Sequence, residues 1–233
     1  MPRAFGLDAA GKAGWVGVVV DDRGFVSAHL GLLVSDVVAE VEGALGAALD
    51  VVAIDIPIGL IAAPTRSADR EARAYVGARR SSVFPAPHPD VVHLTTHAAV
   101  NERLAELGMP LVSVQAFHLF ARVREVAAIA ADPRVVEAFP EASFCAMNGD
   151  RPLLSSKKTW NGQHQRRTLL AAARPSIVVP DDLGAPGLVP ADDVLDAASI
   201  AWSGLRHARG RATSLGDVRE CDRRTGRPAV VWV

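Results

Sequence analysis

The 233-residue sequence has few cysteines, almost no net charge and no long apolar run. Its two cysteines, Cys145 and Cys221, are too few for a disulfide framework and fit a reducing compartment. A net charge of −1 gives no overall signal for nucleic-acid binding, so an anionic partner would have to meet local basic patches. No run of about 20 apolar residues could cross a membrane, and no signal peptide is visible. We therefore expect a soluble cytoplasmic protein.

Two common kinds of catalytic motif are also missing. The seven histidines are scattered and show no zinc-ligand spacing with cysteine. The serine pairs at 81–82 and 155–156 lack the Gly-x-Ser-x-Gly elbow of a nucleophile. Cys145 lies in an apolar stretch, which favours a buried thiol over a nucleophile. The sequence therefore does not indicate zinc chemistry or a nucleophilic side chain.

Hydrophobic residues make up 49% of the chain, enough to build a full core. Apolar runs and helical spacing predict the order β-β-β-α-β in the N-terminal part. The expected strands cover residues 3–8, 15–20, 25–30, 51–55, 134–139 and 226–233. The expected helices cover residues 35–49, 65–78, 91–107, 115–131, 163–173 and 192–207, with a helical turn at 141–147 and loops at 79–89 and 175–190. We expect one α/β domain over residues 1–233, with a helical insertion at about 65–130.

The stretch from Val51 to Leu60 stands at the centre of this pattern. A short run of valine and isoleucine, typical of a strand buried on both faces, ends at Asp55 and is followed by Pro57 and Gly59. Open α/β sheets bind their ligands at the carboxyl ends of strands. Asp55 is therefore a candidate functional acid, and the alternative is an aspartate that caps the next turn.

Other carboxylates also stand at the ends of expected elements. Asp8 ends the first strand, Glu137 and Glu141 flank the end of the fifth, and Asp193 and Asp196 share one face of the last helix. Like charges at that spacing repel each other, so the cluster is either a set of helix caps or a site. Oxygen ligands of this kind suit Mg²⁺ or Mn²⁺, and two such ions about 4 Å apart can promote phosphodiester cleavage.

Two segments are rich in cations. Residues 66–80 hold five arginines, among them Arg79 and Arg80 next to a stiff proline-rich loop, and residues 151–167 hold five cations with no acid, including Lys157 and Lys158. Such patches neutralise phosphates and give salt-dependent binding. The alternative for both segments is a solvated face.

These residues carry a resemblance. The order β-β-β-α-β with Asp8 in the first strand and Asp55 ending the fourth resembles the ribonuclease H-like fold. The string Asp193-Val-Leu-Asp196 is similar to the helix-borne acids of its Holliday-junction resolvase branch. Over nearly its whole length the chain resembles DUF429, a family described as predicted ribonuclease H-like nucleases. The matching stretches are Gly6-Leu-Asp8 with Gly14-Trp15, 55–60, 79–87, Glu137–Glu141 with Ser143-Phe144, Lys157–Thr159 with Gly162, and 192–197.

The resemblance implies a mixed sheet of three antiparallel strands followed by parallel ones, and a nuclease that uses Mg²⁺ or Mn²⁺ on DNA or RNA. Asp8, Asp55, Asp193 and Asp196 would be catalytic metal ligands. Glu137 or Glu141 would add a ligand, and Arg79, Arg80, Lys157 and Lys158 would bind phosphates. The family often has histidine at the position of Phe139, so no metal or proton role follows for that residue.

Two rival functions share this pattern. The actin and sugar-kinase superfamily also begins with a strand, an aspartate and a glycine-rich hairpin, so the turn from Asp8 to Gly14 could wrap a phosphate in a small-molecule kinase or ATPase. Such enzymes usually contain two copies of the fold, and this chain has one signature. The third hypothesis is a non-catalytic protein that keeps the fold. The sequence does not indicate the oligomeric state.

Overall fold

Five strands form one mixed sheet in the order β3-β2-β1-β4-β5. They are β1 (Ala4–Ala9), β2 (Trp15–Asp21), β3 (Gly24–Gly31), β4 (Val51–Ile54) and β5 (Val135–Glu137). Strand β2 is antiparallel to its two neighbours β1 and β3, and β4 and β5 run parallel to β1. The computed structural model, which describes residues 1–233, therefore confirms a mixed α/β sheet flanked by helices.

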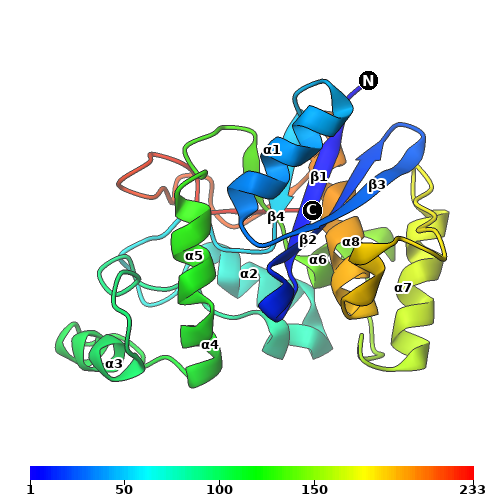
Figure 1. The fold of residues 1–233 in the computed structure, drawn as a ribbon. Helices are drawn as coiled ribbons and strands as arrows, with labels where there is room; N and C mark the ends of the chain where they lie inside the picture. Colours follow the sequence, from blue (N-terminus) through cyan, green and yellow to red (C-terminus); the bar gives the residue numbers. More distant parts are fainter.

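Side-chain alternation along the strands sends residues into two separate cores. On one face Phe5 and Leu7 pack beneath α1 (Val34–Leu45) and α5 (Phe120–Ala127). On the other face Ala4 and Ala53 pack beneath α8 (Ala191–Ala208). Successive residues of a strand point to opposite faces, so a one-residue step decides which core a side chain joins. Figure 1 shows the sheet between these helices.

A long, mainly helical connection joins β4 to β5. It contains α2 (Ser67–Tyr75), the 3₁₀ helix η2 (Gly77–Ser82), α3 (His97–Glu106), α4 (Val114–His118) and α5. After β5 come α6 (Pro140–Met147), α7 (Trp160–Ala172), the 3₁₀ helix η3 (Ala185–Leu188) and α8, and a short 3₁₀ helix η1 (Gly11–Ala13) joins β1 to β2. Helices α3, α4 and α5 lie at one end of the molecule and α7 at the other (Figure 1).

Three expected elements in this connection differ from the structure. The helix expected at 91–107 begins only at His97, because the side chain of Thr96 caps it by accepting from Ala99 N, while 91–96 form turns. The helix expected at 115–131 is interrupted at Leu119, whose N–H bonds to the nearer carbonyl of Ala116. The loop expected at 79–89 starts as part of η2 and is irregular only after Ser82.

The expected final strand at 226–233 is wrong in length and partner. Only β7 (Val231–Trp232) is a strand, and it pairs with β6 (Ser214–Leu215) in a separate two-stranded sheet. A single parallel bridge from Ala138 to Trp232 connects it to the end of β5. The apolar tail therefore covers the sheet edge without extending the sheet.

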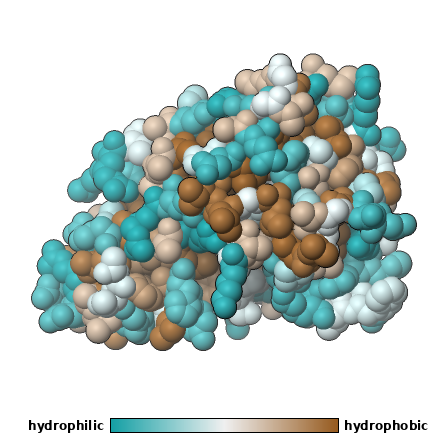
Figure 2. All heavy atoms as spheres, viewed as in Figure 1, coloured by the Kyte–Doolittle hydropathy of each residue, from teal (hydrophilic) through white to brown (hydrophobic).

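No helix combines the length and apolar character needed to span a bilayer. On the face drawn in Figure 2, apolar side chains gather near the middle of the molecule, and polar ones dominate its outline.

Candidate active site

A cleft of about 330 Å³ opens at the carboxyl ends of β1 and β4. It brings together six of the predicted acids, Asp8, Asp55, Glu137, Glu141, Asp193 and Asp196, and adds Asp69. The only cations in its lining are Arg66 and Lys157. Seven carboxylates against two cations make this the position where the chain concentrates negative charge.

The strand register explains how Asp8 and Asp55 reach the same side of the sheet. Leu7 pairs with Ile54, and the N–H of Asp55 continues the pairing by bonding to the carbonyl of Leu7. Leu7 and Ile54 point into the core under α1. The next residues, Asp8 and Asp55, therefore point to the α8 face. The Asp55 carboxylate accepts no hydrogen bond within the chain, so it does not cap the following turn.

A close contact between α8 and β1 brings the other two aspartates to this position. A Cβ atom on Gly6 would lie 2.2 Å from the carbonyl oxygen of Ala197, so glycine is required for this approach. Asp196 directly precedes Ala197 and is 1% exposed. Helix α8 follows Pro190 and has no side-chain cap, which removes the alternative that this aspartate cluster serves as helix caps.

Lys157 supplies the positive charge inside this cluster. Its ammonium group contacts Asp196 and lies 3.6 Å from Oδ2 of Asp192. Lys158 pairs with the same Asp192 oxygen at 2.6 Å. No pattern in the sequence assigns a role to Asp192, yet its buried carboxylate holds both lysines at the edge of the cleft. The predicted lysines and the predicted acids therefore meet at one place.

Burial and mutual repulsion change the acidity of these aspartates. Burial, followed by the charge of Asp196, raises the pKa of Asp55 to about 8. Burial, only partly offset by Lys157, raises the pKa of Asp196 to about 6. Burial and then Asp55 raise the pKa of Asp8 well above its ordinary value, and burial and Asp192 raise that of Asp193. Burial alone would lower the pKa of Lys157, but Asp196, Asp8 and Asp55 outweigh it and raise it. The positive charge of Lys157 is therefore too small to keep all four aspartates at their ordinary acidity.

These shifts predict how stability depends on pH without divalent cations. At neutral pH the folded protein keeps a proton on Asp55, and below about pH 6 also one on Asp196, that the unfolded chain, with aspartate pKa values near 3.9, has lost. The free energy of unfolding should therefore fall as the pH rises from about 6 to about 8, by up to about 1.4 kcal/mol per pH unit for each extra proton bound. Urea unfolding in EDTA measures this slope. Asp55→Asn should flatten it near pH 8, and an equal slope in both proteins would contradict the assignment.

Glu137 lies beside the cluster but in a different set of contacts. It pairs with Ile54 across the sheet and so follows the alternation of the opposite face. Arg66 binds both of its carboxylate oxygens, at 2.6 and 2.8 Å, and also binds Asp69 at 2.6 Å. The backbone N–H of Ile58 donates to Glu137 as well. As a metal ligand, Glu137 would have to exchange these partners, so the geometry favours a supporting role.

Glu141 is held in the same way. Both of its oxygens accept from Nη2 of Arg166, at 2.7 and 2.8 Å, and Arg166 is fully buried. No sequence pattern singles out Arg66 or Arg166. An arginine in a charged helix carries no local signal of burial, and its partner is distant in the chain.

The structure places Arg79 and Arg80 outside the cleft lining. The guanidinium of Arg79 donates to the backbone carbonyls of Leu153 and Leu154, and Arg80 is exposed. The two basic segments therefore lie side by side, since the 153–154 loop leads into Lys157. Neither arginine touches an acid of the cleft.

The acids of the cleft offer only oxygen donors to a divalent metal ion. No group of three or more Asp, Glu, His or Cys side chains lies at ligand spacing. One observation favours a cation: Oδ1 of Asp196 is buried without a hydrogen-bond partner. Asp8, Asp55 and Asp193 complete an all-oxygen set of the kind that Mg²⁺ and Mn²⁺ prefer. The chemistry of these residues therefore fits such an ion. In this structure the ammonium group of Lys157 is the cation that contacts Asp196.

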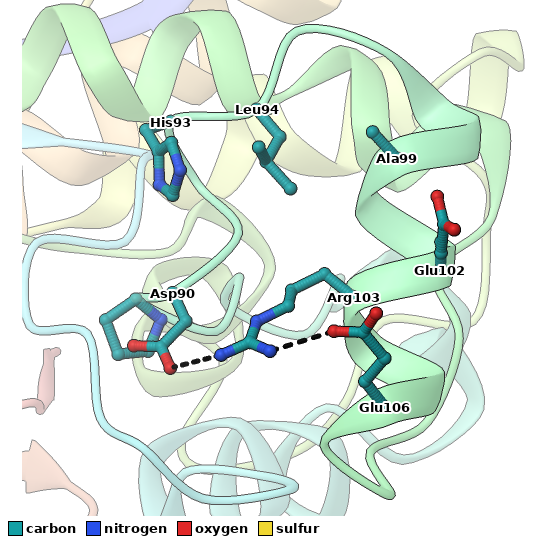
Figure 3. Close-up of a pocket in the computed structure, with 8 residues that line it drawn as sticks. Asp90, His93, Leu94, Ala99, Glu102, Arg103 and Glu106 are labelled. Atoms are coloured by element: carbon teal, nitrogen blue, oxygen red, sulfur yellow. Dashed lines mark hydrogen bonds and ion pairs between the residues drawn. The ribbon is translucent and has the colours of Figure 1, made fainter.

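A larger hollow of about 580 Å³ lies in the connection between β4 and β5, around α3. Figure 3 shows Arg103 between Asp90 and Glu106, with His93 nearby. The guanidinium of Arg103 forms ion pairs with the carboxylates of Glu106, at 2.8 Å, and Asp90, at 4.0 Å. These side chains are about half exposed. The hollow has no cluster of buried acids, so the cleft remains the candidate site.

The glycine-rich turn after β1 does not favour the kinase hypothesis. The turn closes on itself, with Ala10 N bonded to Gly14 O and Gly14 N bonded to Gly11 O. Arg122 also binds the carbonyls of Gly11 and Gly14. Two backbone N–H groups are therefore already used, and none of the residues from 10 to 14 lines the cleft.

Comparison with known proteins gives one match. A family model described as "Protein of unknown function (DUF429)" matches residues 6–220, which include every acid of the cleft. Neither the curated proteins nor the solved structures gave a match.

Proposed function

The chain belongs to the DUF429 family, and we propose that it is a divalent-metal-dependent nuclease with a ribonuclease H-like fold. The element order β-β-β-α-β, with Asp8 in β1 and Asp55 directly after β4, supports the fold assignment. The observation that carries the function is the group of carboxylates in one cleft with raised aspartate pKa values and too few cations. An activity that needs Mg²⁺ or Mn²⁺ accounts for this charge.

Asp8, Asp55, Asp193 and Asp196 would hold the metal. A bound Mg²⁺ or Mn²⁺ would lower the pKa of an attacking water and stabilise the charge that develops on the leaving oxygen. Arg66 and Arg166 keep Glu137 and Glu141 fixed beside these ligands. The two glutamates are thus neutralised by arginines, whereas the four aspartates have no arginine partner.

Cations at the edge of the cleft would position the nucleic acid. Lys157 lies within the cluster, and Lys158 stands on its exposed side at Asp192. Arg79 and Arg80 lie next to the same loop, where they would contact phosphates farther along the strand. Phosphate contacts of this kind fix orientation and carry no sequence information.

The proposal is tested by incubating the protein with single- and double-stranded DNA and RNA in Mg²⁺, Mn²⁺ or EDTA. We expect cleavage with either metal and none in EDTA. Calorimetric titration with Mn²⁺ should give a stoichiometry of one or two ions. A crystal soaked in Mn²⁺ should show them among Asp8, Asp55 and Asp196. Absence of Mn²⁺ binding, or equal cleavage in EDTA, would refute the site.

A further inference from the structure

The cleft also has an apolar part that the carboxylate chemistry does not use. It is formed mainly by Ile56, Pro57, Val83, Phe84, Pro85, Pro87, Leu119 and Phe139. Phe84 is 42% exposed, a large aromatic surface left open beside a group of acids. Segment 83–87 carries no charged residue, so this part of the cleft is not built to bind phosphate.

The segment around Phe84 is held in place at both ends. Arg73 donates to the carbonyl of Val83 at 3.0 Å, and the N–H of Ala86 donates to Asp69 at 2.9 Å. Between these anchors Pro85 restricts the backbone. The phenylalanine ring is therefore presented by a preorganised segment, which lowers the entropic cost of binding a ligand on it.

The same contacts connect this segment to the acids. Asp69, which holds Ala86, is bound by Arg66, and Arg66 binds Glu137 at the end of β5. The apolar part and the charged part of the cleft thus belong to one fixed frame. A ligand that fits both parts has a flat, uncharged ring at one end and a phosphate near the aspartates.

The size of the cleft restricts that ligand further. A volume of about 330 Å³ is near the lower end of the range for small-molecule pockets, about 300–1,000 Å³. A base inside a duplex is stacked on its neighbours, and it must be flipped out of the stack before it can enter such a space and lie on a protein ring. The ring must therefore be a base that is not paired.

We propose that Phe84 and its proline-rich segment bind one unpaired nucleobase of a single-stranded nucleic acid by stacking. This inference rests on the proposed nuclease function, which it deepens by naming the substrate class. Stacking of a base on an aromatic side chain contributes about 1–3 kcal/mol and tolerates any base, because every base has a π face. Single strands should therefore bind more tightly than duplexes of the same sequence.

Fluorescence anisotropy with Mn²⁺ tests the stacking contact. The probes are a short single-stranded oligonucleotide with hydrolysis-resistant phosphorothioate linkages, its duplex, and a base-free deoxyribose-phosphate strand of equal length. Phe84→Ala should weaken binding of the single strand about 5- to 150-fold and leave the base-free strand unchanged. Phe84→Trp should restore binding. Leu188→Ala, which removes an exposed apolar side chain of η3 outside the cleft, is the matched control.

The outcomes separate this inference from the nuclease proposal. Strand cleavage by the wild type, with unchanged single-strand binding by Phe84→Ala, would overturn the base site and leave the nuclease standing. Loss of binding in Phe84→Ala, in a protein that cleaves no nucleic acid, would support the base site and refute the nuclease. Equal affinity of the wild type for the base-free strand would overturn the base site in either case.

Discussion

Replacing Asp55 with asparagine is expected to reduce metal-dependent cleavage about 1,000-fold. The substitution keeps the shape of the side chain and removes a charge from the proposed ligand set. Metal-ion catalysis supplies several kcal/mol of transition-state stabilisation, and each 1.36 kcal/mol changes a rate tenfold. Initial rates of single-strand cleavage in Mn²⁺, with calorimetric titration of Mn²⁺, measure the loss.

The same substitution should stabilise the protein in metal-free buffer. Burial and the charge of Asp196 oppose ionisation of Asp55, whose pKa is raised to about 8, so a neutral amide at this position relieves repulsion. A gain of about 0.5–2 kcal/mol near pH 8 is the size that single stabilising substitutions commonly give. Lower activity with higher stability is the pattern of a functional acid, whereas lower stability would indicate a structural one.

Asp181→Asn is the control for both measurements. Asp181 is an exposed loop acid outside the cleft, so activity, Mn²⁺ affinity and stability should all match the wild type. Unchanged activity in Asp55→Asn would remove Asp55 from the proposed ligand set.

Replacing Arg66 with methionine is expected to cost about 3–5 kcal/mol of unfolding free energy. The change leaves Glu137 and Asp69 buried without their shared cation, and breaking a buried ion pair from one side has a cost of this size. Arg66→Lys should recover only part of the loss, because lysine cannot reproduce the planar set of bonds to Glu137, Asp69 and the carbonyl of Gly59. Urea unfolding at pH 7 gives both values.

Two further variants show whether unpaired charge causes this loss. In Arg66→Met/Glu137→Gln a neutral glutamine replaces the glutamate that Arg66→Met leaves unpaired, so part of the lost stability should return. Arg103→Met removes an arginine that also pairs with an acid three residues later but is 45% exposed, and there the change should stay within about 0.5 kcal/mol. A loss below about 1 kcal/mol in Arg66→Met would show that the buried network does not stabilise the fold.

The elements that sequence reasoning locates well are those whose signal is local. Burial on one or two faces determines which residues a strand or helix contains. The apolar runs of β1, β2 and β4 and the helical spacing of α8 therefore predict these elements directly. The helices between β4 and β5 are predicted less accurately from the sequence. Their boundaries depend on local contacts such as the cap at Thr96 and the interruption at Leu119, which periodicity does not reveal.

The residues of the candidate site likewise fall into those that the sequence predicts and those that it does not. Strand ends and helix spacing indicated Asp8, Asp55, Asp193 and Asp196, and the structure places all four in one cleft. The partners of Glu137 and Glu141 could not be inferred, because Arg66 and Arg166 reach them from distant parts of the chain. Phe84 was visible only as part of a stiff loop, since nothing in the local sequence shows which cavity a loop residue faces.

The pairing of β4 with β5 has a consequence for the order of folding. Val52 pairs with Val135 only when the whole connection between β4 and β5 has been closed into a loop, whereas β1, β2 and β3 pair through short turns. Contacts of high sequence separation form slowly, because the entropy of loop closure is lost before the contacts compensate for it. The residues that frame the cleft come from β1, β4, β5 and the late helix α8, so we expect them to come together after the first hairpins have formed. Repulsion among the carboxylates is therefore absent from the early steps of folding, and it acts on the assembled protein mainly through the rate at which that protein unfolds.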